Sequence, residues 1–177
     1  MIKAYKGVDN NIVANSGRGH YKYKVNKWYE EKEAKDGHCG YHASLYPLTC
    51  LHYGTRFFVV ACDGEFSELG DYTLACTKIK FVKEISRFEL IDRAVVFILE
   101  NPKVENLNHI STEKADDVTD FAIVRGKNPI AKGKKGSLIW LLKEDSSNDI
   151  IEMNRFIIGK DGILENTYYD VAGNIVT

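Results

Sequence analysis

The chain has 177 residues, of which 44% are hydrophobic and 28% are charged, and its formal net charge is −1. This size and composition indicate a folded protein of one or two small domains, which needs no disulfide or metal to bury a core. The balanced charge disfavours bulk binding to nucleic acid or to an anionic membrane, and the polar residues 1–7 and the absence of a long apolar run predict neither a signal peptide nor a membrane span.

Apolar alternation predicts a series of strands in the first half of the chain. A turn at 7–11 and a glycine-flanked loop at 15–20 separate the first two. The expected strands cover residues 2–5, 20–29, 40–44, 56–62 and 72–82. Because no secretory signal is present, we expect a cytoplasmic protein with four reduced thiols, Cys39, Cys50, Cys62 and Cys76.

Two segments carry helix signals. Pro47 suits the first turn of a short helix over about 47–53, and Gly54 is a typical stop. Ser86 and Glu89 have the spacing of a capping box, which opens the main predicted helix over about 86–101. Apolar residues then recur at helical spacing up to Pro102, namely Ile91, Ala94, Val95, Ile98 and Leu99.

The second half of the chain has a different pattern. Residues 103–118 are polar and aperiodic, which predicts a linker. Residues 119–177 contain five strand patterns, a glycine- and lysine-rich loop at 127–136 and a hairpin turn at 160–162, which together predict an antiparallel β-meander. The expected fold is therefore α+β and predominantly antiparallel, with an N-terminal domain over 1–102, the linker, and a C-terminal unit over 119–177.

Several motifs resemble a family of uncharacterised phage and prophage proteins. The family carries a Gly-aromatic-His-Ala-Cys-x-x-Pro motif after an aromatic-rich strand, and a short β-rich piece at its C-terminus. The residues that carry the resemblance are Tyr21, Tyr23, Val25, Trp28, Tyr29, Gly40, Tyr41, His42, Ala43 and Pro47, with Phe121–Gly126, Gly136–Ile139 and Gly162–Tyr169 in the C-terminal piece.

The chain departs from this family at three places. Ser44 stands where the family has Cys, Asn26 replaces a Gly, and residues 103–117 replace a repeat region. The resemblance implies an origin in a mobile element and action in the host cytoplasm, but it implies no reaction.

The first functional hypothesis is binding. Tyr, Trp and Arg are the residue types that dominate interfaces, and they are dense between residues 18 and 46. The expected partner is a host or defence protein, or a small nucleotide that the protein sequesters as a sponge. The residues expected to bind are Arg18, His20, Tyr41, His42 and Ser44, with no cofactor and an unassigned oligomeric state. Packing of the aromatic residues on a sheet face is the alternative for at least half of this aromatic set.

The second hypothesis is an enzyme that uses NAD. Tyr5-Lys6-Gly7 and Gly40–Ser44 resemble, in order and spacing, the NAD-binding strands of ADP-ribosyltransferases. The resemblance would give Lys6, His42 and Ser44 to NAD and the chemistry to Glu65 or Glu68. Lys6 lacks the planar fork with which an arginine binds phosphate. A virion-associated or structural protein, assembled through its C-terminal strands, is the third hypothesis.

The motif region also contains residue types that bind metals or act as nucleophiles. His38, Cys39 and His42 lie close to Cys50 and His52, but their spacing matches no common zinc motif, so no metal is expected. A nucleophile–base pair of Cys39 or Ser44 with His42 has no supporting motif, and the favoured alternative is that Cys39 is a loop residue and Ser44 caps the following helix.

Overall fold

The computed structural model describes all residues except 15–20, 36, 37 and 71, and its described chain is an α+β fold, as expected. It divides into two compact units, unit 1 over Met1–Phe97 and unit 2 over Ile98–Thr177. Within the described residues, no helix has the length and apolarity to cross a membrane.

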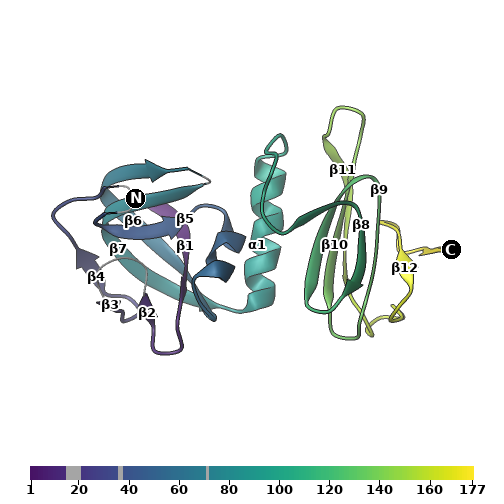
Figure 1. Ribbon diagram of the computed structural model, residues 1–177, viewed down its shortest axis with the longest axis horizontal. Coiled ribbons are helices and arrows are strands. Elements are labelled where there is room, and N and C mark those ends of the chain that lie inside the picture. Colours follow the sequence, from purple (N-terminus) through teal and green to yellow (C-terminus); the bar gives the residue numbers. More distant parts are fainter. Residues whose placement is uncertain (15–20, 36–37, 71) are drawn as a thin grey trace. The chain divides into compact units, whose positions relative to one another are not determined.

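Unit 1 is built on one five-stranded sheet (Figure 1). Its strands lie in the order β4-β7-β5-β1-β6, and a further pairing of β6 with β7 closes four of them into a small barrel. The strands are β1 (Ile2–Val8), β4 (Trp28–Glu30), β5 (Tyr41–Ser44), β6 (Arg56–Leu69) and β7 (Thr73–Ile85), and β2 (Val13–Ala14) pairs separately with β3 (Tyr21–Lys22).

Side chains fill the interior of this barrel. Alternate residues of β1, such as Ala4 and Val8, point to the same face and are fully buried. They pack with aromatic and aliphatic residues of β5, β6 and β7, including Tyr41, Phe58, Val60, Leu74, Ile79 and Phe81. The barrel is therefore a packed core that encloses no open lumen among its described residues.

Both helix predictions are confirmed. The short helix is the 3-10 helix η1 (Pro47–His52), which begins at its proline. The main helix is α1 (Arg87–Glu100), and the Glu89 N–H donates to Ser86 Oγ at 3.0 Å, as the capping box requires. A glycine follows η1 because a Cβ at Gly54 would lie 2.2 Å from the Val8 carbonyl oxygen.

Unit 2 contains a run of three parallel strands, β8 (Ile110–Val118), β9 (Phe121–Gly133) and β10 (Leu138–Glu144). Ile110 pairs with Ile123, and Ile123 pairs with Trp140, so successive strands stack like the coils of a solenoid. Antiparallel strands complete the sheet, namely β11 (Ile150–Ile157), β12 (Tyr168–Tyr169) and β13 (Ile175–Val176).

The coils turn at corners that interrupt the strand pairing. The register shifts between Thr112 and Lys114, where Glu113 has a left-handed φ of 61°. Its carboxylate accepts hydrogen bonds from the backbone N–H groups of Lys127 at 2.8 Å and Asn128 at 3.0 Å on the next coil. Gly126 leaves room for this carboxylate, because a Cβ there would lie 2.4 Å from the Glu113 carboxyl group and would displace it.

Unit 2 differs from the sequence prediction in two ways. The segment expected to be the linker 103–118 contains β8, and the loop expected at 127–136 is mostly part of β9. The sheet is mixed, where an antiparallel meander was expected. Parallel pairing normally needs a dozen or more connecting residues, and here each bent coil provides that connection itself.

Candidate functional site

The central motif lies on β5, inside the fold of unit 1. Tyr41 is 3% exposed and belongs to the barrel core, so its side chain contributes to packing. Ser44 is also 3% exposed, and its Oγ lies 2.8 Å from the Tyr46 carbonyl oxygen, to which it donates. Both residues thus have structural roles in positioning β5 and the segment that leads into η1.

Lys6 lies next to this motif, in the barrel. Its Nζ donates a hydrogen bond to the His42 carbonyl oxygen, and its residue is 7% exposed. Burial lowers the pKa of the Lys6 ammonium group, and the nearby thiols of Cys50, Cys62 and Cys76 partly offset this. The structure therefore brings Lys6, His42 and Ser44 onto adjacent strands, as the enzyme hypothesis requires.

The proposed acids lie elsewhere. Lys6 pairs with Phe58 on β6, and Glu65 lies further along that strand, exposed, with its N–H bonded to Thr77 Oγ1 at 2.9 Å. Glu65 therefore lies beyond Cys62, the last residue of β6 that pairs with β1, and the pairing of β6 with β7 is interrupted between Asp63 and Phe66. Glu68 is described only through its backbone, which pairs with Leu74.

Other predicted residues contribute little to a site. Arg18 and His20 lie outside the described residues. All four cysteines are free thiols, and burial raises the pKa of the Cys50 thiol to about 12. No group of three His, Cys, Asp or Glu side chains suited to a metal ion occurs in the described part of the chain.

A basic and aromatic surface lies on the outside of unit 1, where β4 meets β7. We call it the Trp28 surface and define it by Trp28 and Lys80, together with three exposed lysines of the segment that precedes β4, Lys22, Lys24 and Lys27. Trp28 pairs directly with Lys80, and the Lys80 Nζ lies 5.3 Å from the centre of the indole ring. The tryptophan remains 41% exposed, which is unusual for so large an apolar side chain.

Tyr29 holds the other lysines of this surface in place. Its ring faces inward against Tyr23, with 5.1 Å between the ring centres. Its hydroxyl oxygen accepts a hydrogen bond from the Lys24 N–H at 2.8 Å, and the Lys27 Nζ lies 5.1 Å from the ring centre. These contacts hold residues 22–27 against Tyr29, whose side chain leaves β4 on the face opposite to that of Trp28.

The Trp28 surface carries uncompensated positive charge. Neighbouring Lys78 is neutralised by Glu30 at 3.0 Å, whereas no carboxylate among the described residues pairs with the four lysines of the surface. An exposed indole with an ammonium group beside its ring can stack on an aromatic ligand and pair with its negative charge.

The sequence contained part of this signal. Trp28 and Tyr29 belong to the aromatic-rich segment of the binding hypothesis, and residues 21–29 contain three lysines and no acid. However, Tyr23, Tyr41 and Tyr46 of that segment are buried in the structure. The contribution of Lys80 follows only from the pairing of β4 with β7.

Comparison with known proteins gives one match. The family described as "Domain of unknown function (DUF7666)" matches residues 2–93, which is more than half of the chain and nearly all of unit 1. No curated protein and no solved structure matches the chain.

Proposed function

This chain belongs to the DUF7666 family, and we propose that it acts by binding a nucleotide ligand on the Trp28 surface. One observation carries the proposal, the exposed Trp28 with the Lys80 ammonium group 5.3 Å from its ring centre and three further lysines without carboxylate partners among the described residues. A nucleotide matches both features, because its base has an aromatic face and its phosphate is anionic.

Stacking and charge would contribute to binding in different ways. Stacking of one base on an aromatic side chain contributes about 1–3 kcal/mol. Phosphate contacts with lysine add an electrostatic term that weakens as salt concentration rises. Trp28 would select for the base, while Lys24, Lys27 and Lys80 would hold the phosphate.

The resemblance to phage and prophage proteins supports a proposed biological role. We place the protein in the host cytoplasm, as an accessory protein that sequesters a signalling nucleotide and so opposes a nucleotide-activated defence. Single-stranded nucleic acid has the same recognition chemistry and is the other source of the ligand. Direct inhibition of a defence protein would use the surface differently, through acidic side chains of the partner.

The enzyme hypothesis gains less support from the geometry. An ADP-ribosyltransferase needs its phosphate-binding residue and its catalytic acid around one NAD molecule. Lys6 is buried in the barrel, whereas Glu65 is exposed on β6 beyond the residues that pair with β1.

Binding is testable with the fluorescence of Trp28. The chain has two tryptophans, so the Trp140→Phe variant leaves Trp28 as the sole reporter. We expect AMP, a cyclic dinucleotide or an oligothymidylate to quench it saturably, and we expect Trp28→Ala to weaken binding in calorimetry by about 1–3 kcal/mol. Tighter binding of the cyclic dinucleotide indicates a sponge, and tighter binding of the oligonucleotide indicates a strand binder.

The control for charge is Lys160→Gln, an exposed lysine in unit 2, set against Lys80→Gln. If none of the three probes binds, or if Lys160→Gln weakens binding as much as Lys80→Gln, the proposal is wrong. Capture of an acidic protein by the wild type but not by Lys80→Gln, without nucleotide binding, would replace it with the inhibitor hypothesis.

A further inference from the structure

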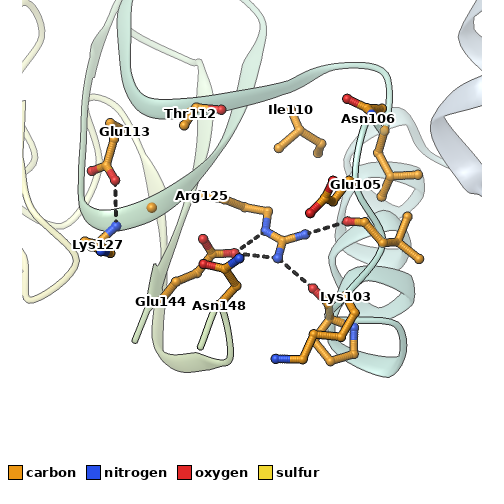
Figure 2. Close-up of a pocket in the computed structure, with 14 residues that line it drawn as sticks. Lys103, Glu105, Asn106, Ile110, Thr112, Glu113, Arg125, Lys127, Glu144 and Asn148 are labelled. Carbon is orange, nitrogen blue, oxygen red and sulfur yellow. Dashed lines mark hydrogen bonds and ion pairs between the residues drawn. The ribbon is translucent and has the colours of Figure 1, made fainter. Parts of the chain in front are cut away.

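Unit 2 contains a pocket that takes no part in the proposed nucleotide binding. Its volume is about 740 Å³, within the range of about 300–1,000 Å³ that small-molecule sites occupy. The segment 102–107 forms one wall, and the bends of β8 and β9 at Glu113 and Gly126 form another (Figure 2). Glu144, at the end of β10, and Asn148, in the turn after it, complete the lining.

Arg125 fixes the base of the pocket. Its Nε donates to Glu144 at 2.6 Å, and its Nη2 donates to the Pro102 carbonyl oxygen at 2.8 Å (Figure 2). Both side chains of the Arg125–Glu144 ion pair are only 13% exposed. The guanidinium group is therefore committed to holding the wall segment and is not available for an anionic ligand.

Two further charged groups of the lining are committed in the same way. Lys103 Nζ lies 2.6 Å from both the Ser147 carbonyl oxygen and the Asp149 carboxylate. The Glu113 carboxylate accepts the two N–H groups of the β9 corner described above. These contacts preform the walls, which lowers the entropy cost of binding a ligand.

The remaining side chains of the pocket lining are mostly neutral, and their charges balance. Three basic and three acidic residues line the pocket, so the lining has no net charge. Glu105, Asn106, Thr112, Lys127 and Asn148 remain to bind a ligand, and they combine hydrogen-bond donors with acceptors. Val104, Leu107 and Ile110 provide an apolar strip beside them.

We propose that this pocket binds a neutral polyhydroxylated ligand of the saccharide class. Each sugar hydroxyl is both a donor and an acceptor, which matches the mixture of carboxylate, amide and hydroxyl groups. The C–H face of a sugar ring matches the apolar strip, and the absence of net charge in the lining matches a neutral molecule. A disaccharide fits the volume of about 740 Å³.

The test is a titration of the isotope-labelled full chain with maltose, cellobiose and lactose, followed by NMR. We expect saturable shifts for resonances of residues 104–113 and 125–127 with at least one disaccharide. Glu105→Ala and Asn106→Gly should each weaken the affinity severalfold. Asn106 has a left-handed φ of 60°, so glycine keeps its backbone conformation while removing the amide.

The matched control is Glu152→Ala, which removes an exposed glutamate outside the pocket and should leave the affinity unchanged. An absence of saturable shifts with all three disaccharides overturns the inference, as does an affinity that neither pocket variant changes. Stronger shifts of the same resonances with AMP also overturn it. None of these outcomes depends on Trp28, so the inference can fail while nucleotide binding stands.

Discussion

The salt dependence of ligand binding gives a quantitative test of the Trp28 surface. Each phosphate that a lysine neutralises on a single strand releases counterions, and the logarithm of the association constant falls by about 0.7 per contact for each tenfold rise in salt. The surface has four lysines without carboxylate partners among the described residues. The expected slope is therefore about −2.8, which weakens binding about 50-fold between about 50 and about 200 mM salt.

Single lysine substitutions should change this slope in equal steps. The magnitude of the slope should fall from about 2.8 to about 2.1 in each single variant, because one contact is lost. These variants are Lys22→Gln, Lys24→Gln, Lys27→Gln and Lys80→Gln. Trp28→Ala should weaken binding by about 1–3 kcal/mol but leave the slope unchanged, since stacking releases no counterions. Stacking and charge are thus separable in one series of measurements.

The assay is fluorescence anisotropy of a labelled oligothymidylate of about ten nucleotides, which is within the footprint of one small binding domain. Titrations at several salt concentrations give the slope for the wild type, each variant and the Lys160→Gln control. The reasoning is refuted if the slope of the wild type is near zero, or if the variant with all four substitutions keeps the full slope.

Three further predictions concern the fold. Gly54→Ala should destabilise unit 1 by about 3 kcal/mol or more in urea unfolding, because its Cβ would meet the Val8 backbone at 2.2–2.5 Å. Gly70→Ala is the control and should be nearly neutral, because its Cβ meets nothing within 4 Å. Burial lowers the pKa of Lys6 in the folded state, so between that pKa and 10.5 the unfolded chain binds more protons than the folded chain. The free energy of unfolding of the wild type should therefore rise with pH through this window, and a Lys6→Met variant should lack the rise. Arg125→Met should cost unit 2 about 2–3 kcal/mol, because it leaves the Glu144 carboxylate, 13% exposed, without its ion pair, and adding Glu144→Gln should recover part of the loss.

Each of these has a contradicting outcome. Equal effects of Gly54→Ala and Gly70→Ala would show that close approach to β1 does not require glycine at 54. Parallel stability–pH curves for the wild type and Lys6→Met would show that the amine titrates alike in both states. If Glu144→Gln adds fully to the cost of Arg125→Met, when unfolding is followed by Trp140 fluorescence, the two side chains are not coupled.

The elements whose causes are local could be predicted from the sequence. Ser86 and Glu89 begin α1 because the cap bonds to a backbone N–H three residues away. Pro47 begins η1 because its ring fixes φ and its missing N–H would have had no helical partner. The strands of unit 1 follow from alternation, which reflects the two faces of a sheet.

The sequence could not show which predicted site residues are buried. Tyr41 and Ser44 have the chemistry of a site, but the pairing of β5 with both β1 and β7 places them in the interior. In unit 2, polarity made residues 110–118 look like a linker, yet they form β8 because their backbone pairs with β9. No local sequence pattern predicts either outcome.

The sequence by itself determined the helices, most strands of unit 1, the α+β class and the aromatic, lysine-rich segment 21–29. Only the tertiary structure decided that Trp28 stays exposed beside Lys80, and that Arg125 closes one end of a pocket instead of binding a ligand. The physical reason is the distance along the chain over which each interaction acts. Helix caps and alternation act between residues a few positions apart, whereas both candidate sites depend on strand register between segments that are distant in the chain.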